Sequence, residues 1–180
     1  MQRVGLLAVS AIGADRPGIV AAVTGVLLEH GVNVEDSQMA ILAGHFSMTV
    51  VLALPGGADP DALRSSLEAA AAELGLEGLS LSEVSDVEGR QAEPSHMVTV
   101  YGSDHPGIVH SVASALAERS WDITDLNTRL VGDGGESLYA LMLEVAVPAG
   151  EAGDLESALD AVAGEQGVEV SVRELEDDDL

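Results

Sequence analysis

A short loop with the composition of an anion-binding turn occurs twice in this chain. It reads Asp15, Arg16, Pro17, Gly18, Ile19 in the first half and Asp104, His105, Pro106, Gly107, Ile108 in the second. Each copy precedes a helical pattern, so we expect it to open a helix, with Asp15 as cap and Pro17 in the first turn. The free N–H groups and dipole of a helix N-terminus favour a carboxylate, and glycine lets a ligand approach the backbone closely. Helix capping alone would use the same residues.

The loop belongs to a longer internal repeat. Residues 14–36 match residues 103–125 at a constant offset of 89 positions, and Val23, Leu27 and Asp36 each meet an identical residue there. A unit of about 85 residues is too long for a solenoid module. The repeat therefore indicates two tandem copies of one small domain.

Each copy predicts the order strand, helix, strand, strand, helix, strand. The strands are expected at 4–10, 32–42, 45–54, 76–84, 97–101, 122–131, 137–147 and 168–173, and the helices at 19–30, 59–74, 107–119 and 153–165. From 45 to 54 one set of alternate residues is apolar and the other is mixed, which is typical of a sheet covered by helices on one side. The sequence thus predicts the α+β class, as two tandem ferredoxin-like βαββαβ domains with antiparallel sheets.

Composition sets the expected domain boundaries. Residues 1–86 form the first domain, 87–95 a polar linker, 96–175 the second domain and 176–180 an acidic tail. Near residues 132–135 the second copy has four extra residues, which predicts a longer hairpin there. Aromatic residues are only 2% of the chain, so the two cores must be aliphatic.

Charge and missing residue types exclude several function classes. With 31 acidic and seven basic residues the net charge is −24, which disfavours direct binding to nucleic acid or an anionic membrane. Cysteine is absent, and all seven basic residues are arginine, which excludes thiolate, Schiff-base and lysine-dependent phosphate chemistry. No signal peptide and no apolar stretch of ~20 residues occurs, so we expect a soluble cytoplasmic protein.

Catalytic and metal-binding patterns are not expected either. No Gly-x-Ser-x-Gly elbow appears. His105 and His110 are five residues apart, a spacing that does not align two ligands on a helix. We predict no metal, and we expect Trp121 to pack rather than to stack on a ligand.

The repeated loop, placed between a first strand and a first helix, resembles that of the ACT domain, a small amino-acid-sensing module. With the segments 31–38 and 44–48, the chain is similar to the tandem ACT family of glycine cleavage system transcriptional repressors, over residues 3–173. In ACT domains two sheets pair side by side. The effector binds where the loop of one domain meets the second strand of its neighbour.

The resemblance implies two sets of ligand-binding residues. The backbones of 15–19 and 104–108 would hold the carboxylate of a small amino acid, such as glycine or serine. Its amino group and side chain would meet Asn33, Glu35 and Asp36 in the first copy, and Asp122, Thr124 and Asp125 in the second. An acid beside an ammonium group forms a charge-assisted hydrogen bond. For Asp36 and Asp125 a solvated carboxylate at a strand edge is an equal alternative.

The resemblance also implies a role. We expect a free-standing regulatory protein without cofactor or catalytic activity, which forms a homodimer and acts through a DNA-binding or enzyme partner protein. A ligand-free interaction module and a regulatory subunit of a metabolic enzyme remain alternatives. The family name favours glycine, but no pocket residue selects it over serine.

Overall fold

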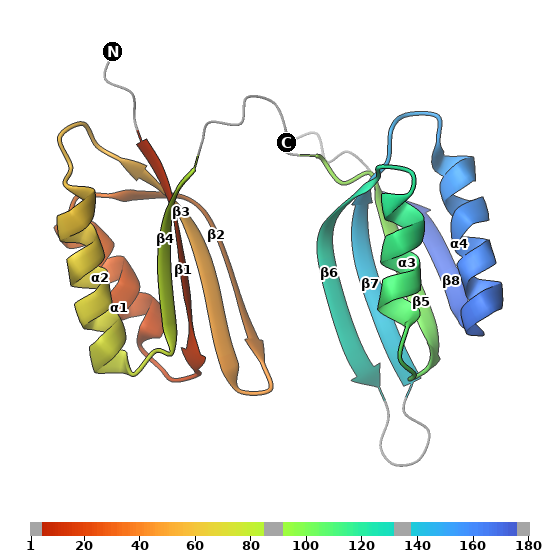
Figure 1. Cartoon of the computed structure of the whole chain (residues 1–180), viewed down its shortest axis with the longest axis horizontal. Coiled ribbons are helices and arrows are strands. Elements are labelled where there is room, and N and C mark those ends of the chain that lie inside the picture. The colour runs from red at the N-terminus through yellow and green to blue at the C-terminus, as the bar shows by residue number, and fades with distance from the viewer. Residues whose placement is uncertain (1–4, 85–91, 132–137, 176–180) are drawn as a thin grey trace. The chain divides into compact units, whose positions relative to one another are not determined.

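The computed structural model describes residues 5–84, 92–131 and 138–175. The predicted acidic tail, the extra hairpin residues and most of the predicted linker lie outside the described residues. The chain divides into two compact units, Met1–Gly89 and Arg90–Leu180 (Figure 1). Each unit is described by itself.

Both units have the predicted βαββαβ order, which confirms the fold class. The first contains β1 (Gly5–Ala14), α1 (Ile19–Glu29), β2 (Asn33–Leu42), β3 (His45–Leu54), α2 (Pro60–Leu74) and β4 (Gly78–Val84). The second contains β5 (His96–Ser103), α3 (Ile108–Ala117), β6 (Asp122–Val131), β7 (Leu138–Ala146), α4 (Ala152–Gln166) and β8 (Glu169–Glu174). The strand orders are β2-β3-β1-β4 and β6-β7-β5-β8, all antiparallel, and both helices of a unit cover one face of its sheet (Figure 1).

The helix-covered faces hold the two cores. The alternation predicted for β3 is confirmed, because Phe46, Val50 and Leu52 are fully buried while Thr49 between them is exposed. The second core is built in the same way from residues of its own unit. Trp121 packs into it, as predicted, and its indole N–H donates to Glu151 Oε2 at 2.7 Å. Each sheet therefore has one covered face and one open face.

The first strand of each unit extends past its predicted end, because the glycine that follows there continues the pairing. Gly13 pairs with Phe46, and a Cβ on Gly13 would lie 3.0 Å from Leu76 Cα. At the same place in the second unit, a Cβ on Gly102 would lie 2.6 Å from Val168 Cγ1. These glycines mark a close approach between the first strand and the chain after the second helix. The strand consequently reaches the edge of the repeated loop.

In the described part of the chain, the helices are too short or too polar to cross a bilayer.

Candidate functional site

The repeated loop ends on a glycine that caps the following helix with its backbone. Gly18 is the N-cap of α1 with φ 97°, and Gly107 is the N-cap of α3 with φ 110°. The first intrahelical hydrogen bonds run from Ala22 N–H to Gly18 O and from Ser111 N–H to Gly107 O, both 2.9 Å. The N–H groups before them point out of the helix end. This arrangement can receive an anion.

Two details predicted for this loop are wrong. Asp15 does not cap α1, since the helix has no side-chain cap. Instead, the Asp15 N–H donates to the Gly44 carbonyl at 2.9 Å, which ties the loop to the turn between β2 and β3. Pro17 precedes the cap and does not lie in the first helical turn. The reason is that Gly18, with its positive φ, turns the chain into the helix three residues later than a cap at Asp15 would.

The first helix of each unit carries no acidic residue in its first turn. The second helices do: Asp59 caps α2 by accepting the N–H groups of Asp61 and Ala62 at 3.0 and 3.3 Å, and Asp154 lies in the first turn of α4. In a chain with 31 acids this difference matters, because a carboxylate beside a helix N-terminus compensates the dipole. The N-termini of α1 and α3 therefore keep their partial positive charge for an external anion.

The second residue of the loop is engaged within its own unit. The Arg16 guanidinium lies over Gly75, the C-cap of α2, where its Nη2 would be 3.2 Å from a Cβ on that glycine. In the second unit His105 Nε2 lies 2.9 Å from the carbonyl oxygen of Gln166, the last residue of α4. His105 thereby supplies a donor to the carbonyl end of α4, and the Arg16 guanidinium lies at the corresponding end of α2. Both side chains thus connect the loop to that helix.

Replacing His105 by alanine is expected to lower the stability of the second unit by about 0.5–1.5 kcal/mol, because the bond to Gln166 is lost. His105→Arg introduces the residue that the first unit uses at this place, and should retain most of the stability. Urea denaturation followed by circular dichroism measures the difference. Equal losses in the two variants would contradict the anchoring role.

The predicted residues on the second strands lie at the beginning of those strands. Asn33, Glu35, Asp36, Asp122 and Thr124 are exposed, and Asp125 is half-buried. Asn33 Nδ2–H donates to Glu35 Oε1 at 3.3 Å, and Asp125 Oδ2 accepts from Asn127 Nδ2–H at 2.6 Å. In both units this polar cluster is accessible to a small polar ligand.

A β-bulge at the same place in both units was not predicted. The register with the neighbouring strand shifts between Val34 and Asp36, and between Ile123 and Asp125. Glu35 and Thr124 are the extra residues. A bulge re-aims side chains and breaks the alternation on which strand prediction depends. The bulge occurs at matching positions of the two repeats, but the residue pattern of the strands does not indicate it.

Within one unit the structure does not bring the two predicted sets together. Ala14, next to the loop, pairs with His45, which in turn pairs with Leu42 at the end of β2. Asn33 begins β2 at the opposite end, where it pairs with Ala53. At ~3.3 Å per residue the two ends of β2 are roughly 25–30 Å apart. The second unit has the same arrangement, so a joint site requires the second strand of another ACT-like unit.

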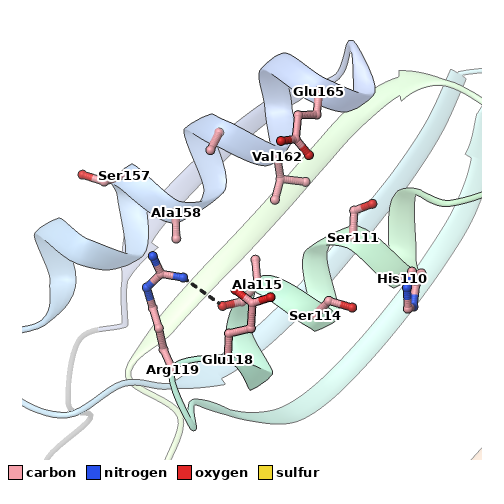
Figure 2. Close-up of a pocket in the computed structure, with 11 residues that line it drawn as sticks. His110, Ser111, Ser114, Ala115, Glu118, Arg119, Ser157, Ala158, Val162 and Glu165 are labelled. Atoms are coloured by element: carbon pink, nitrogen blue, oxygen red, sulfur yellow. Dashed lines mark hydrogen bonds between the residues drawn. The ribbon is translucent and has the colours of Figure 1, made fainter.

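A separate groove of about 440 Å³ lies between α3 and α4 (Figure 2). It is lined mostly by small and charged side chains, and none of the predicted ligand-binding residues is among them. Figure 2 shows Arg119 at one end, where its Nη1–H donates to the Ala115 carbonyl at 3.2 Å. In the first unit a hydrogen bond of 3.0 Å between His30 Nε2 and Ser66 Oγ bridges the corresponding helices. The groove extends to His110 and Ser111 near the start of α3, but no residue of the repeated loop lines it.

Comparisons with known proteins agree with this geometry. A model of the ACT domain matches residues 6–78 and 96–173. The glycine cleavage system transcriptional repressor of Escherichia coli is 29% identical over 171 residues, which cover 92% of this chain and 88% of that protein. Phosphoserine phosphatase SerB2 of Mycobacterium tuberculosis is 29% identical over 168 residues, but the chain spans only 40% of its length. The crystal structure of an unknown protein from Galdieria sulphuraria has a TM-score of 0.83 and 31% identity, with 97% of this chain and 100% of that chain covered.

Proposed function

Because this chain belongs to the ACT domain family, we propose that it is a regulatory protein that senses a small amino acid, such as glycine or serine, at its two repeated loops. The carboxylate of the effector binds the N-terminus of α1 or α3. Its ammonium group meets the polar cluster at the start of a second strand. Ligand occupancy changes the contacts of the chain with a partner protein.

One observation carries the proposal. In both units the first helix has no acidic side chain in its first turn, while the second helix has one there. A zwitterion fits the surroundings, since the loop offers N–H donors and the second strand offers carboxylates.

The proposed site needs two ACT units, because each unit holds the two halves at opposite ends. β2 and β6 are edge strands, and an edge strand presents unpaired N–H and C=O groups to another strand. Antiparallel pairing of two such edges places the start of each strand beside the end of the other. Each loop then faces the polar cluster of the neighbouring unit, which gives the homodimer expected from the family resemblance.

A protein partner, rather than DNA, suits the charge of the chain. A net charge of −24 repels phosphates, so control of transcription would pass through a DNA-binding protein. Transcriptional control of glycine cleavage is one outcome of this mechanism, in analogy with the name of the Escherichia coli relative. Regulation of an enzyme is the alternative.

Titration with each of the twenty amino acids tests the proposal. We expect one or a few small amino acids to bind, and to stabilise the fold by about 2.7 kcal/mol at 100 times the dissociation constant. Isothermal calorimetry measures the binding and a thermal shift measures the stabilisation. Analogues that lack the carboxylate, such as the amino-acid amides, should not bind. The absence of any heat or shift would instead support an interaction module without effector.

A further inference from the structure

Three of the four strands in the first sheet have no acidic or arginine side chain on the open face. We define the uncharged face as the residues of β1, β3 and β4 that point away from the helices, without His45 at its edge. They are Leu6, Ala8, Ser10, Ile12 and Ala14 of β1, Ser47, Thr49, Val51 and Ala53 of β3, and Gly78, Ser80, Ser82 and Val84 of β4. All are half-buried or exposed within their own unit. Ser10 and Thr49 lie near its centre, with their hydroxyl oxygens 3.0 Å apart. His45 begins β3 on the same side, with its Nε2 3.5 Å from Glu77 Oε2.

This composition differs from the rest of the molecule. Charged residues make up 21% of the chain. On the open face of the second sheet the corresponding strands β5, β7 and β8 carry Glu144, Glu169 and Arg173. The edge strands do not differ in this way, because β2 carries Asp36 where β6 carries Asp125. An open sheet face in water is normally polar, whereas small and apolar side chains are typical of a sheet that packs against another layer. The two repeats share a fold, so this difference arises from the side chains alone.

We propose that the uncharged face packs against the same face of a second copy of this chain. Two molecules with a net charge of −24 repel each other over most of their surface, and this face lets them meet without opposing like charges. A positively charged partner would be recognised by the acidic surface instead. The inference concerns the open face and is independent of the loop sites.

The area is sufficient for such a contact. Strands ~4.8 Å apart with a rise of ~3.3 Å per residue give a patch of roughly 15 by 30 Å, or about 1,000 Å² of surface buried in total. That value is at the lower limit for a specific interface. Small side chains allow two sheets to approach to ~10 Å. The contact should therefore depend on protein concentration.

Thr49→Glu tests this contact, because Thr49 is exposed near the centre of the face and the new charge would oppose its own copy. Sedimentation velocity over a range of concentrations should show half the mass of the unchanged chain. Thr49→Val, the matched control, should keep the full mass. Mixing Thr49→Glu with Thr49→Arg should restore it, since the opposed charges then attract. Ser82→Glu, on exposed β4, is a second variant if Thr49→Glu does not fold.

Three results would overturn the proposal. The first is an unchanged chain that is monomeric at the highest concentration. The second is a Thr49→Glu variant that keeps the full mass. The third is a mixture of the Glu and Arg variants that fails to recover it, which would assign the face to another occupant. Thr49→Glu should halve the mass whether or not the edge strands of two chains also pair. Thr49 lies on β3, which is an inner strand and takes no part in that pairing.

Discussion

Truncation of Phe46 to alanine is expected to lower the free energy of unfolding of the first unit by about 3–5 kcal/mol. Phe46 is the only phenylalanine of the chain and is 1% exposed in the core between β3 and the helices. The loss combines the transfer of an aromatic ring to water with the cavity that remains. With so few aromatic residues nearby, little can move in to fill this cavity.

Chemical denaturation or calorimetry would measure the effect on Phe46→Ala. The control is Leu28→Ala on α1, where the side chain is 80% exposed and the change should be within about 0.5 kcal/mol. The transition of the second unit should not move, because its core is formed by its own residues. A loss below about 1 kcal/mol for Phe46→Ala would contradict the packing described here.

Gly18→Ala is expected to destabilise the first unit by about 1–2 kcal/mol and to abolish effector binding at its loop. No atom lies within 4 Å of a Cβ placed on Gly18, so the cost is the backbone strain at φ 97° and not a clash. Relief of this strain would rotate the N–H groups at the start of α1. These are the groups that we propose to hold the carboxylate.

The matched control for Gly18→Ala is Gly25→Ala in the same helix. A Cβ placed on Gly25 would also have no atom within 4 Å. Gly25 lies inside α1, however, and its φ is not positive. Alanine there should stabilise the unit by about 0.5–1 kcal/mol and leave binding unchanged. Thermal denaturation and calorimetric titration of the two variants separate the effects. Normal effector binding by Gly18→Ala would show that the N-terminus of α1 is not part of the proposed site. The difference in stability between Gly18→Ala and Gly25→Ala tests only the backbone strain at Gly18.

Much of the fold was predictable because the pattern is local. One-sided burial produces alternation in strands and helical spacing in helices, so β3 was predicted with its observed bounds and the element order was correct. The internal repeat strengthened the prediction of the element order, since each element appears twice. The recurring loop at the start of each first helix was predicted for the same reason.

The details of the candidate site depended on contacts between residues far apart in the sequence. The alternation gives no sign of the bulge at Glu35, and a side chain that suits a cap, such as Asp15, is not used as one when a glycine turns the chain first. Gly13 lies beyond the predicted end of the first strand, but in the structure it pairs with Phe46 where Leu76 approaches the backbone.

The sequence by itself determined the two ACT units, their element types and the position of the repeated loop. Only the tertiary structure decided that Arg16 and His105 reach the second helix, that the loop and Asn33 lie at opposite ends of one sheet, and that the uncharged face spans β1, β3 and β4. The physical reason is that periodicity records which side of an element is buried. Strand order and register decide which distant residues become neighbours, and these depend on the packing of the whole unit.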